Sequence, residues 1–268
     1  MAPIGKKAKL KQTREIILGT LVILIVLVIV AFVVYFMVNR SEGLDPMTLC
    51  PAKGPRGHFV LLVDKTDPLT FTQKAAFTVT LQELIEKRIP EGYLLSVFVL
   101  GEDFKANAEP LIELCNPGTG ADKSELTANL KQLKRQYQER FLGPLQKLSE
   151  SLLASQPANC SPIFEMLQLV GINAFRKHDV KGERGLIVIS DMLQNTPQFS
   201  MYSGPLDYAT FSASEYGRKL QLELTDVKVE IYYLINTPQI QTKRNLKFWE
   251  DYFSKAGARI VAVQPLEG

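Results

Sequence analysis

This chain of 268 residues has few His and Cys residues and a small net charge. It has 2 His and 3 Cys, and no CxxC or CxxH spacing occurs, so the sequence offers no zinc site. Lys and Arg number 31 against 28 Asp and Glu, and the resulting net charge of +3 gives no general electrostatic basis for nucleic-acid binding. Gly118-Thr119-Gly120 lacks the Lys-Ser/Thr end of a P-loop. No Ser or Cys can be placed beside either His, which leaves a hydrolase triad unsupported.

One long apolar run stands near the N-terminus. Residues 16–38 contain no charge and, at ~1.5 Å per residue, are long enough to cross ~30 Å of hydrocarbon. We expect an uncleaved single-pass anchor, since a signal peptide has a shorter apolar region followed by a small-x-small cleavage pattern. The basic tail 1–15 predicts a cytoplasmic N-terminus in the cell (inner) membrane. Everything after residue 39 is then periplasmic, or extracytoplasmic.

The rest of the chain reads as one domain behind a short linker. Residues 39–57 are rich in Gly and Pro and predict that linker, and the folded part is expected over 58–268. Strands and helices alternate, which predicts an α/β fold with a mainly parallel sheet, and strands 93–100 and 110–115 form an antiparallel edge. A helical insert is expected over about 124–155, kinked or split at Gly143-Pro144. Further helices are expected over 71–88, 162–177, 212–224 and 246–256, and further strands over 228–235 and 260–263.

Two buried strands of this pattern each end in an acid. Phe59 to Val63 is followed by Asp64, with Thr66 two residues on, and Gly185 to Ile189 is followed by Ser190-Asp191. If the strands are adjacent, both carboxylates meet at one edge and form an oxygen site suited to Mg²⁺ or a similar cation. The alternative for each acid alone is a turn residue or a helix cap.

The order of elements and the acid-tipped strands resemble the von Willebrand factor A-like (vWA) fold over roughly residues 58–265. That resemblance implies a doubly wound six-stranded sheet in the order 3-2-1-4-5-6 and a metal-ion-dependent adhesion site that binds Mg²⁺ or Ca²⁺. The implied ligands are Asp64, Thr66, Ser161 and Asp191. Pro68 replaces a ligand hydroxyl, Met192 replaces the Gly that usually follows the last Asp, and Asp67 or Thr70 are the possible substitutes.

The segment Asp64-Lys65-Thr66-Asp67-Pro68-Leu69-Thr70 also resembles the phosphorylation loop of P-type ATPases and haloacid dehalogenases. In that family Asp64 would form an aspartyl phosphate. The enzymes also need a later strand that ends in paired acids, and Asp191-Met192-Leu193 offers one. We therefore expect no enzyme activity.

Three cysteines in an oxidising compartment allow one disulfide. Cys115 and Cys160 flank the helical insert, so we expect a bridge between them at its base. The alternative is three unpaired thiols.

Taken together, the sequence predicts a membrane-anchored interaction module, with residues 16–38 in the membrane and an unidentified protein partner at the rim of Asp64, Thr66, Ser161 and Asp191. The alternative is a metal-independent envelope scaffold that acts through its helical insert.

Overall fold

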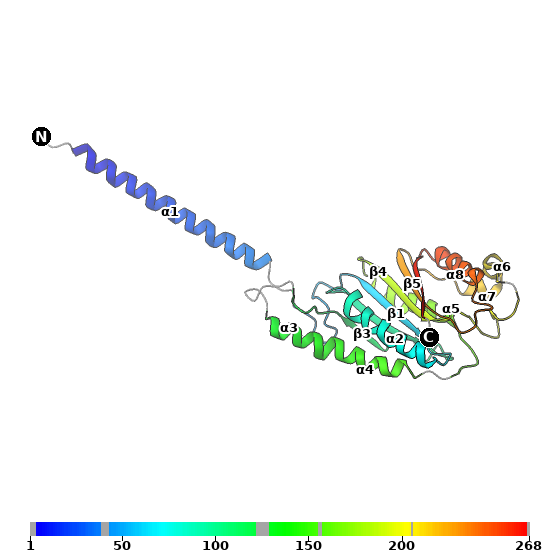
Figure 1. Cartoon of the computed structure of the whole chain (residues 1–268). Helices are drawn as coiled ribbons and strands as arrows, with labels where there is room; N and C mark the ends of the chain where they lie inside the picture. The colour runs from blue at the N-terminus through cyan, green and yellow to red at the C-terminus, as the bar shows by residue number, and fades with distance from the viewer. Residues whose placement is uncertain (1–3, 39–42, 122–128, 155–156, 205, 267–268) are drawn as a thin grey trace. The chain divides into compact units, whose positions relative to one another are not determined.

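A computed structural model describes residues 4–38, 43–121, 129–154, 157–204 and 206–266. The chain divides into two units, one of which contains helix α1 (Ile4–Val38) and the other the α/β domain (Figure 1). Each unit is described by itself.

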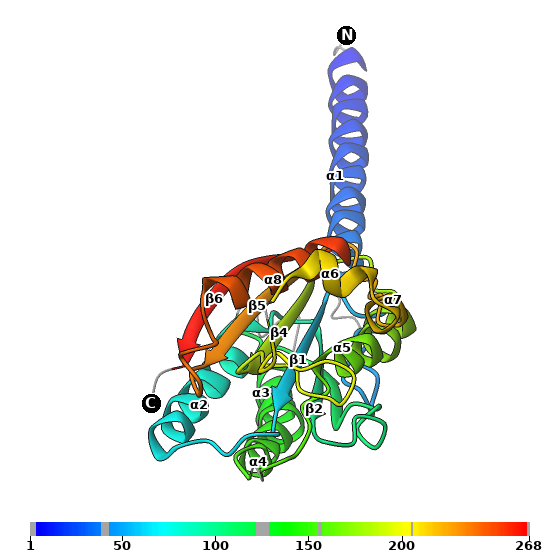
Figure 2. The same ribbon diagram turned by 90° about the vertical axis from the view of Figure 1, so that its right-hand side faces the viewer.

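The domain is built on one sheet of six strands in the order β3-β2-β1-β4-β5-β6 (Figure 2). β3 is antiparallel to β2, and every other neighbouring pair is parallel. This is the predicted order, including the antiparallel edge. The strands are β1 (His58–Asp64), β2 (Leu94–Leu100), β3 (Ile112–Cys115), β4 (Arg184–Ser190), β5 (Val227–Leu234) and β6 (Arg259–Leu266).

Helices cover both faces of the sheet (Figure 2). β1 is buried along its whole length because alternate side chains enter two apolar layers, with Val60 and Leu62 in one and Leu61 and Val63 in the other. The first layer contains α5 (Ile163–Val170), its π-helical extension η3 (Gly171–Arg176) and α8 (Lys243–Lys255). The second contains α2 (Phe71–Glu83), η1 (Leu84–Arg88) and α4 (Gly143–Leu152).

The helical insert passes through Gly143-Pro144 without a break. α3 (Leu130–Gln136) continues into a π-helical turn, η2 (Tyr137–Leu142), and then into α4. Pro144 has no N–H to donate, so a regular α-helix would leave one carbonyl of the preceding turn without its partner. The chain widens here into a π-helical turn, in which the Gly143 N–H donates to Gln138 O, five residues back. The expected kink or split is thus a local widening. Residues 124–128 and 155 of the insert lie outside the described residues.

One predicted helix is wrong in its bounds. In place of one helix over 212–224, the chain forms two short helices that begin earlier and end earlier, α6 (Tyr208–Ala213) and α7 (Glu215–Lys219). Ser214 is extended, and its side chain accepts a hydrogen bond from Gly217 N, so it ends one helix and caps the next.

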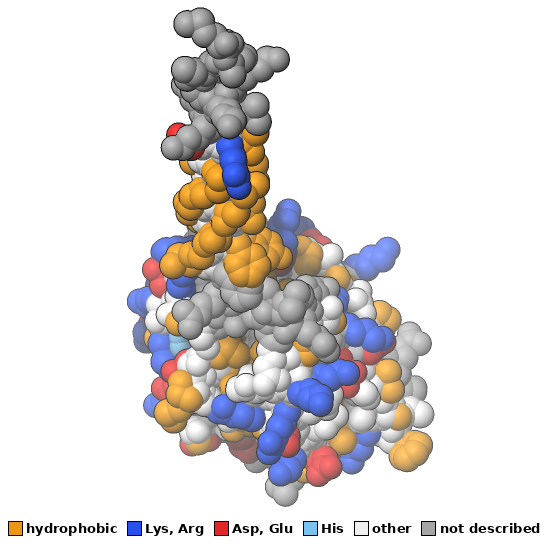
Figure 3. All heavy atoms as spheres, turned by 90° about the vertical axis from the view of Figure 1, so that its left-hand side faces the viewer, with side chains coloured by type: hydrophobic (Ala, Val, Ile, Leu, Met, Phe, Trp, Pro, Cys, Tyr) orange, Lys and Arg blue, Asp and Glu red, His pale blue; other side chains and the backbone are white. Residues whose placement is uncertain are grey.

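Helix α1 contains a span, Arg14–Tyr35, that is long and apolar enough to cross a membrane. Its hydrophobic side chains are exposed all round, as Figure 3 shows for the face toward the viewer. A helix that is apolar on every side has no single face to bury in a globular core, in contrast to the amphipathic helices of the domain.

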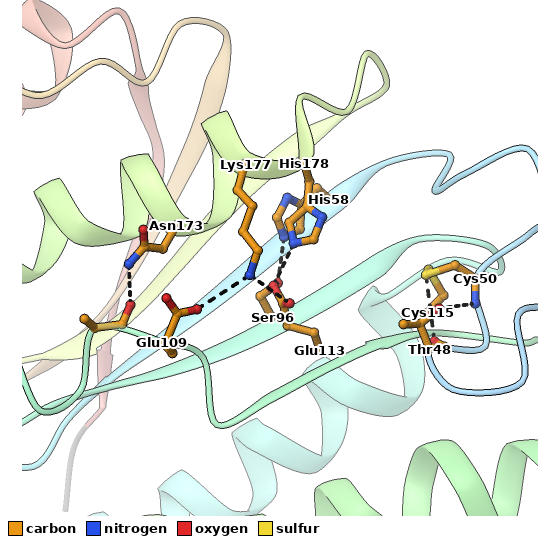
Figure 4. Close-up of polar contacts among 11 residues, drawn as sticks. Thr48, Cys50, His58, Ser96, Glu109, Glu113, Cys115, Asn173, Lys177 and His178 are labelled. Carbon is orange, nitrogen blue, oxygen red and sulfur yellow. Dashed lines mark hydrogen bonds and ion pairs between the residues drawn. A yellow bond between two sulfur atoms is a disulfide. The ribbon is translucent and has the colours of Figure 1, made fainter.

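The disulfide differs from the expected one. Cys50 is bonded to Cys115 (Figure 4). Cys160 carries a free thiol. Cys115 ends β3 opposite Leu94, at the edge where β2 begins, whereas Ser161, next to Cys160, pairs with Asn195 beyond the end of β4. Cys115 and Cys160 therefore lie at opposite edges of the sheet, about 20 Å apart by strand length, which is too far for a bridge.

Part of the stretch expected as linker is folded onto the domain. The N–H of Cys115 donates to Thr48 O at 2.8 Å, and Leu49 is buried in the second apolar layer. The chain thus joins the domain at the edge of the sheet where β1 and β2 begin.

Candidate functional site

Asp64 and Asp191 come to the same edge of the sheet. β1 and β4 are parallel neighbours, with Val63 opposite Ile189, so both chains leave the sheet side by side. Carboxyl ends of parallel strands form the usual ligand-binding edge of such sheets. This edge, which we call the rim, is opposite the edge at which the chain joins the domain.

Asp64 is buried and hydrogen-bonded at both oxygens. Its Oδ1 accepts bonds from Thr66 N at 3.0 Å and from Thr66 Oγ1 at 2.6 Å, and its Oδ2 accepts one from Ser190 Oγ at 2.7 Å. Burial raises the pKa of Asp64 above its usual value, although these bonds act in the other direction.

Thr66 brings Ser161 into the same cluster. The hydroxyl oxygens of Thr66 and Ser161 lie 3.0 Å apart. Ser161 is held by two backbone bonds with Asn195, of 2.7 and 3.0 Å, so the segment before α5 is fixed to the loop after β4. Three of the four predicted residues are therefore in one connected network.

Asp191 supplies a buried oxygen to which no described residue donates a hydrogen bond. Its Oδ1 accepts a bond from Leu193 N at 2.9 Å, while Oδ2 has no hydrogen-bond donor among the described residues. Burial raises the pKa of Asp191 well above its usual value, and the negative charge of Asp64 raises it further. A buried carboxylate oxygen without a donor is costly, so this site is electrostatically incomplete.

The residue after Asp191, Met192, forms a turn in an unusual backbone conformation. Its φ of 56° lies in the left-handed region, which a residue with a Cβ rarely adopts. The turn is nevertheless fixed: Met192 N donates to Ser190 Oγ at 2.8 Å, and Met192 O accepts a bond from Trp249 Nε1 at 2.8 Å. The backbone therefore takes the conformation that a Gly would adopt easily, although a buried Met is present.

The two possible substitute ligands have different surroundings. Asp67 is half-buried and interacts with Asp191, and its charge adds to the rise in the pKa of that residue. A side-chain interaction with Asp67 also favours the protonated form of Asp191. Thr70 is the N-cap of α2, and its Oγ1 accepts a bond from Gln73 N at 3.2 Å. Its hydroxyl is thus engaged at the helix end.

Ser190 is a member of the cluster that sequence analysis missed. Its hydroxyl donates to Asp64 and accepts from Met192 N, so it joins the two acid-tipped strands. The available signal was its position directly before Asp191, at the last residue of a strand expected to lie beside Asp64.

The donor set fits a hard cation. Carboxylate and hydroxyl oxygens of Asp64, Thr66, Ser161 and Asp191 are the ligand types that Mg²⁺ and Ca²⁺ prefer, and the unpartnered Asp191 Oδ2 is an oxygen that a cation would satisfy. The described part of the chain contains no group of three or more His, Cys, Asp or Glu side chains arranged to hold a metal ion. A cation at the rim would therefore need the hydroxyl ligands.

The structure also places a Ser beside a His, which the sequence could not. His58 Nε2 lies 2.8 Å from Ser96 Oγ, and Ser96 donates to Glu113 at 3.0 Å (Figure 4). Ser96 is fully buried, and His58 Nδ1 has no partner among the described residues to orient the ring. A hydrolytic triad needs an accessible Ser and an oriented His, so this cluster reads as structural.

No protein-family model and no curated protein matches the sequence. Among solved structures, the chain is similar to an aerotolerance-related membrane protein from Bacteroides fragilis NCTC 9343, with 11% identity, 79% of this chain and 92% of that chain covered, and a TM-score of 0.35. It is also similar to the pilus adhesin SpaC from Lactobacillus rhamnosus GG in its open conformation, with 10% identity, 58% of this chain and 16% of that chain covered, and a TM-score of 0.30.

The fold assignment rests on the domain itself. Its strand order, its antiparallel edge strand β3 and the acids at the ends of β1 and β4 are the features that the vWA resemblance implied. The chain therefore has a von Willebrand factor A-like fold behind an N-terminal apolar helix.

Proposed function

We propose that this chain is a membrane-anchored interaction module that binds a protein partner through a divalent cation at the rim. The ligands are Asp64, Thr66, Ser161 and Asp191, with Asp67 as a further one. The observation that carries the proposal is Asp191 Oδ2, which is buried beside a second buried carboxylate and has no donor within the described parts of the chain. When bound, the cation neutralises the two carboxylates and offers a coordination position to an acidic side chain of the partner.

Three features support the anchored arrangement. Arg14–Tyr35 has the length and composition of a membrane span, and the domain contains a disulfide, which persists in extracytoplasmic compartments. The rim also lies at the edge of the sheet opposite the chain's point of attachment. A partner at the rim therefore does not compete with the attached segment for the same edge.

Titration of the full chain in detergent tests the proposal. We expect isothermal calorimetry with Mg²⁺, Mn²⁺ and Ca²⁺ to show one site per chain, which Asp191→Asn weakens at least tenfold. Asp251→Asn is the matched control, because Asp251 is a half-buried carboxylate of α8 that pairs with Lys247. Absence of binding in the wild-type chain would contradict the proposal.

A metal-independent scaffold is the second candidate, and one observation favours it. Both oxygens of Asp64 already accept hydrogen bonds from Thr66 and Ser190, and Pro68 replaces a ligand hydroxyl. Under this alternative Asp191 stays protonated, in keeping with its raised pKa, and the partner binds elsewhere. Partner binding that survives both EDTA and Asp191→Asn would support it.

A further inference from the structure

The helical insert runs toward the rim from the edge of the sheet at which the chain joins the domain, and two hydrogen bonds fix this direction. In η2, the Arg140 guanidinium donates to Pro46 O, in the segment through which the chain joins the domain. Near the end of α4, Ser151 O accepts a bond from Lys65 Nζ at 2.8 Å, and Lys65 directly follows β1. The head of the β1 arrow and α4 accordingly lie at the same end of the domain (Figure 2).

Helix α3 comes before η2, so it extends past the joining segment on the side away from the rim. Lys131 precedes Arg140 by nine residues, a length of ~14 Å in a helix. Burial agrees with this direction, because α3 has no buried residue, whereas η2 buries Tyr137, Phe141 and Leu142 in the second apolar layer. The helix therefore leaves the core of the domain as it passes the joining segment.

The exposed helix α3 has a strongly basic side. Lys131, Lys134 and Arg135 are three and four residues apart and lie on one face of the helix, which we call the basic face. Arg135 pairs with Glu139 at 2.9 Å, and both side chains are mostly exposed, so solvent weakens this pair. Neither Lys131 nor Lys134 has an ion-pair partner in the part of the chain that the structure describes.

The length of the chain before the domain limits how far this face can lie from a bilayer. Five residue steps connect Val38, at the end of α1, to Gly43, where the domain begins, and they span at most ~18 Å. The basic face lies on the side of the domain from which this connection leaves. It therefore comes within reach of lipid headgroups when α1 spans a membrane.

We propose that the basic face of α3 binds anionic phospholipid headgroups of the membrane that α1 spans, and so leaves the rim, at the opposite edge of the sheet, open to a partner. This inference rests on the anchored arrangement of the proposed function, and it does not depend on the cation. Each Lys or Arg near an anionic surface favours the contact about fivefold, and the attraction falls off over ~8 Å at physiological salt. The tether raises the effective concentration of the domain at the surface, so three charges on one face are sufficient.

Lysine acetylation of the full chain in lipid nanodiscs tests this contact. The chain is treated with acetyl N-hydroxysuccinimide ester in phosphatidylcholine nanodiscs and in nanodiscs with added phosphatidylglycerol, and mass spectrometry follows each lysine. We expect Lys131 and Lys134 to react at least threefold more slowly in the anionic nanodiscs, and high salt to remove the difference. Lys147 of α4 and Lys74 of α2 are exposed on elements nearer the rim and should react equally in both.

Two variants separate the basic face from the rest of the insert. Arg135→Gln removes one charge of the face and keeps both reporter lysines, so we expect the contact to weaken about fivefold and the protection of Lys131 and Lys134 to fall. Lys147→Gln removes a charge of the same insert outside the basic face and should leave that protection unchanged. Protection that survives both Arg135→Gln and high salt would overturn a contact based on charge.

The remaining outcomes separate this inference from the proposed function. Equal acetylation of Lys131 and Lys134 in neutral and anionic nanodiscs would overturn the headgroup contact and leave the anchor intact. A chain that does not co-elute with nanodiscs would overturn the anchor, and the headgroup contact with it.

Discussion

Asp64 and Asp191 end neighbouring parallel strands and are buried at the same edge of the sheet. The charge of Asp64 raises the cost of ionising Asp191, and among the described residues Asp191 Oδ2 has no hydrogen-bond partner. Polar residues that keep such an arrangement in a folded domain are typical of functional sites rather than of stable cores.

Ser190→Ala tests the connection between the two strands. The change leaves Asp64 Oδ2 buried without its donor, and we expect it to lower the free energy of unfolding by about 1–3 kcal/mol. Urea denaturation of the full chain in detergent measures this value. In an Asp64→Asn background the same change should cost clearly less, and equal costs in both backgrounds would show that the two side chains are not coupled.

Backbone strain at Met192 can be tested by comparing an Ala and a Gly variant, because here the Gly variant should be the more stable of the two. Met192→Ala removes a fully buried side chain but keeps a Cβ at positive φ, and should cost about 2–5 kcal/mol. Met192→Gly loses the same packing but relieves the strain, so it should be more stable than the Ala variant by about 1 kcal/mol. Thermal unfolding of both variants decides, and a less stable Gly variant would contradict the observed turn.

The disulfide closes a long loop, because its two cysteines are 65 positions apart in the sequence. Replacing Cys50 and Cys115 together by Ser should lower the free energy of unfolding by about 2–5 kcal/mol, because the unfolded chain regains the freedom that the bridge removed. Cys160→Ser is the control and should have little effect. Peptide mapping without reductant should find Cys50 linked to Cys115, and a Cys115–Cys160 peptide would contradict the structure.

We expect the buried His58 to lower the free energy of unfolding in acid. Burial, and then the nearby His178, lower the pKa of His58 from 6.5 to about 3. The unfolded chain therefore binds a proton at a pH where the folded chain does not, so the contribution of His58 is intact above about pH 6.5 and is lost as the pH falls toward 3. At pH 4.5 the loss is about 2–3 kcal/mol.

His58→Gln is the matched variant for this effect. It removes the titrating ring, so the wild-type chain should lose more stability than the variant between pH 7 and 4.5. Parallel pH profiles for the two chains would show that His58 does not titrate in this way. Comparing the two chains also removes the contribution of the rim carboxylates, which are present in both.

The fold was predictable because its signals are local and strong. The apolar strands before Asp64 and Asp191 each contain enough large side chains to fill two layers, and the alternation of strands and helices leaves few topologies. Asp64, Thr66 and Ser161 were placed together by the vWA resemblance, and the structure connects them through hydrogen bonds.

The features that the sequence did not reveal depend on contacts between segments that lie far apart in the sequence. Cys50 reaches Cys115 because the segment before β1 folds back onto the end of β3, and nothing in the Gly- and Pro-rich composition of 39–57 indicates that return. Ser190 reads as part of a buried strand, and its role appears only once β1 lies beside β4. Ser214 ends a helix through its own side chain, whereas the apolar spacing around it continues.

A crystal structure of the chain grown with Mn²⁺ tests the central claim most directly, because anomalous scattering locates the ion without assuming its ligands. The account predicts one anomalous peak at the rim, within bonding distance of oxygens of Asp64 and Asp191 and beside the hydroxyls of Thr66 and Ser161. An empty rim at saturating Mn²⁺ would contradict it.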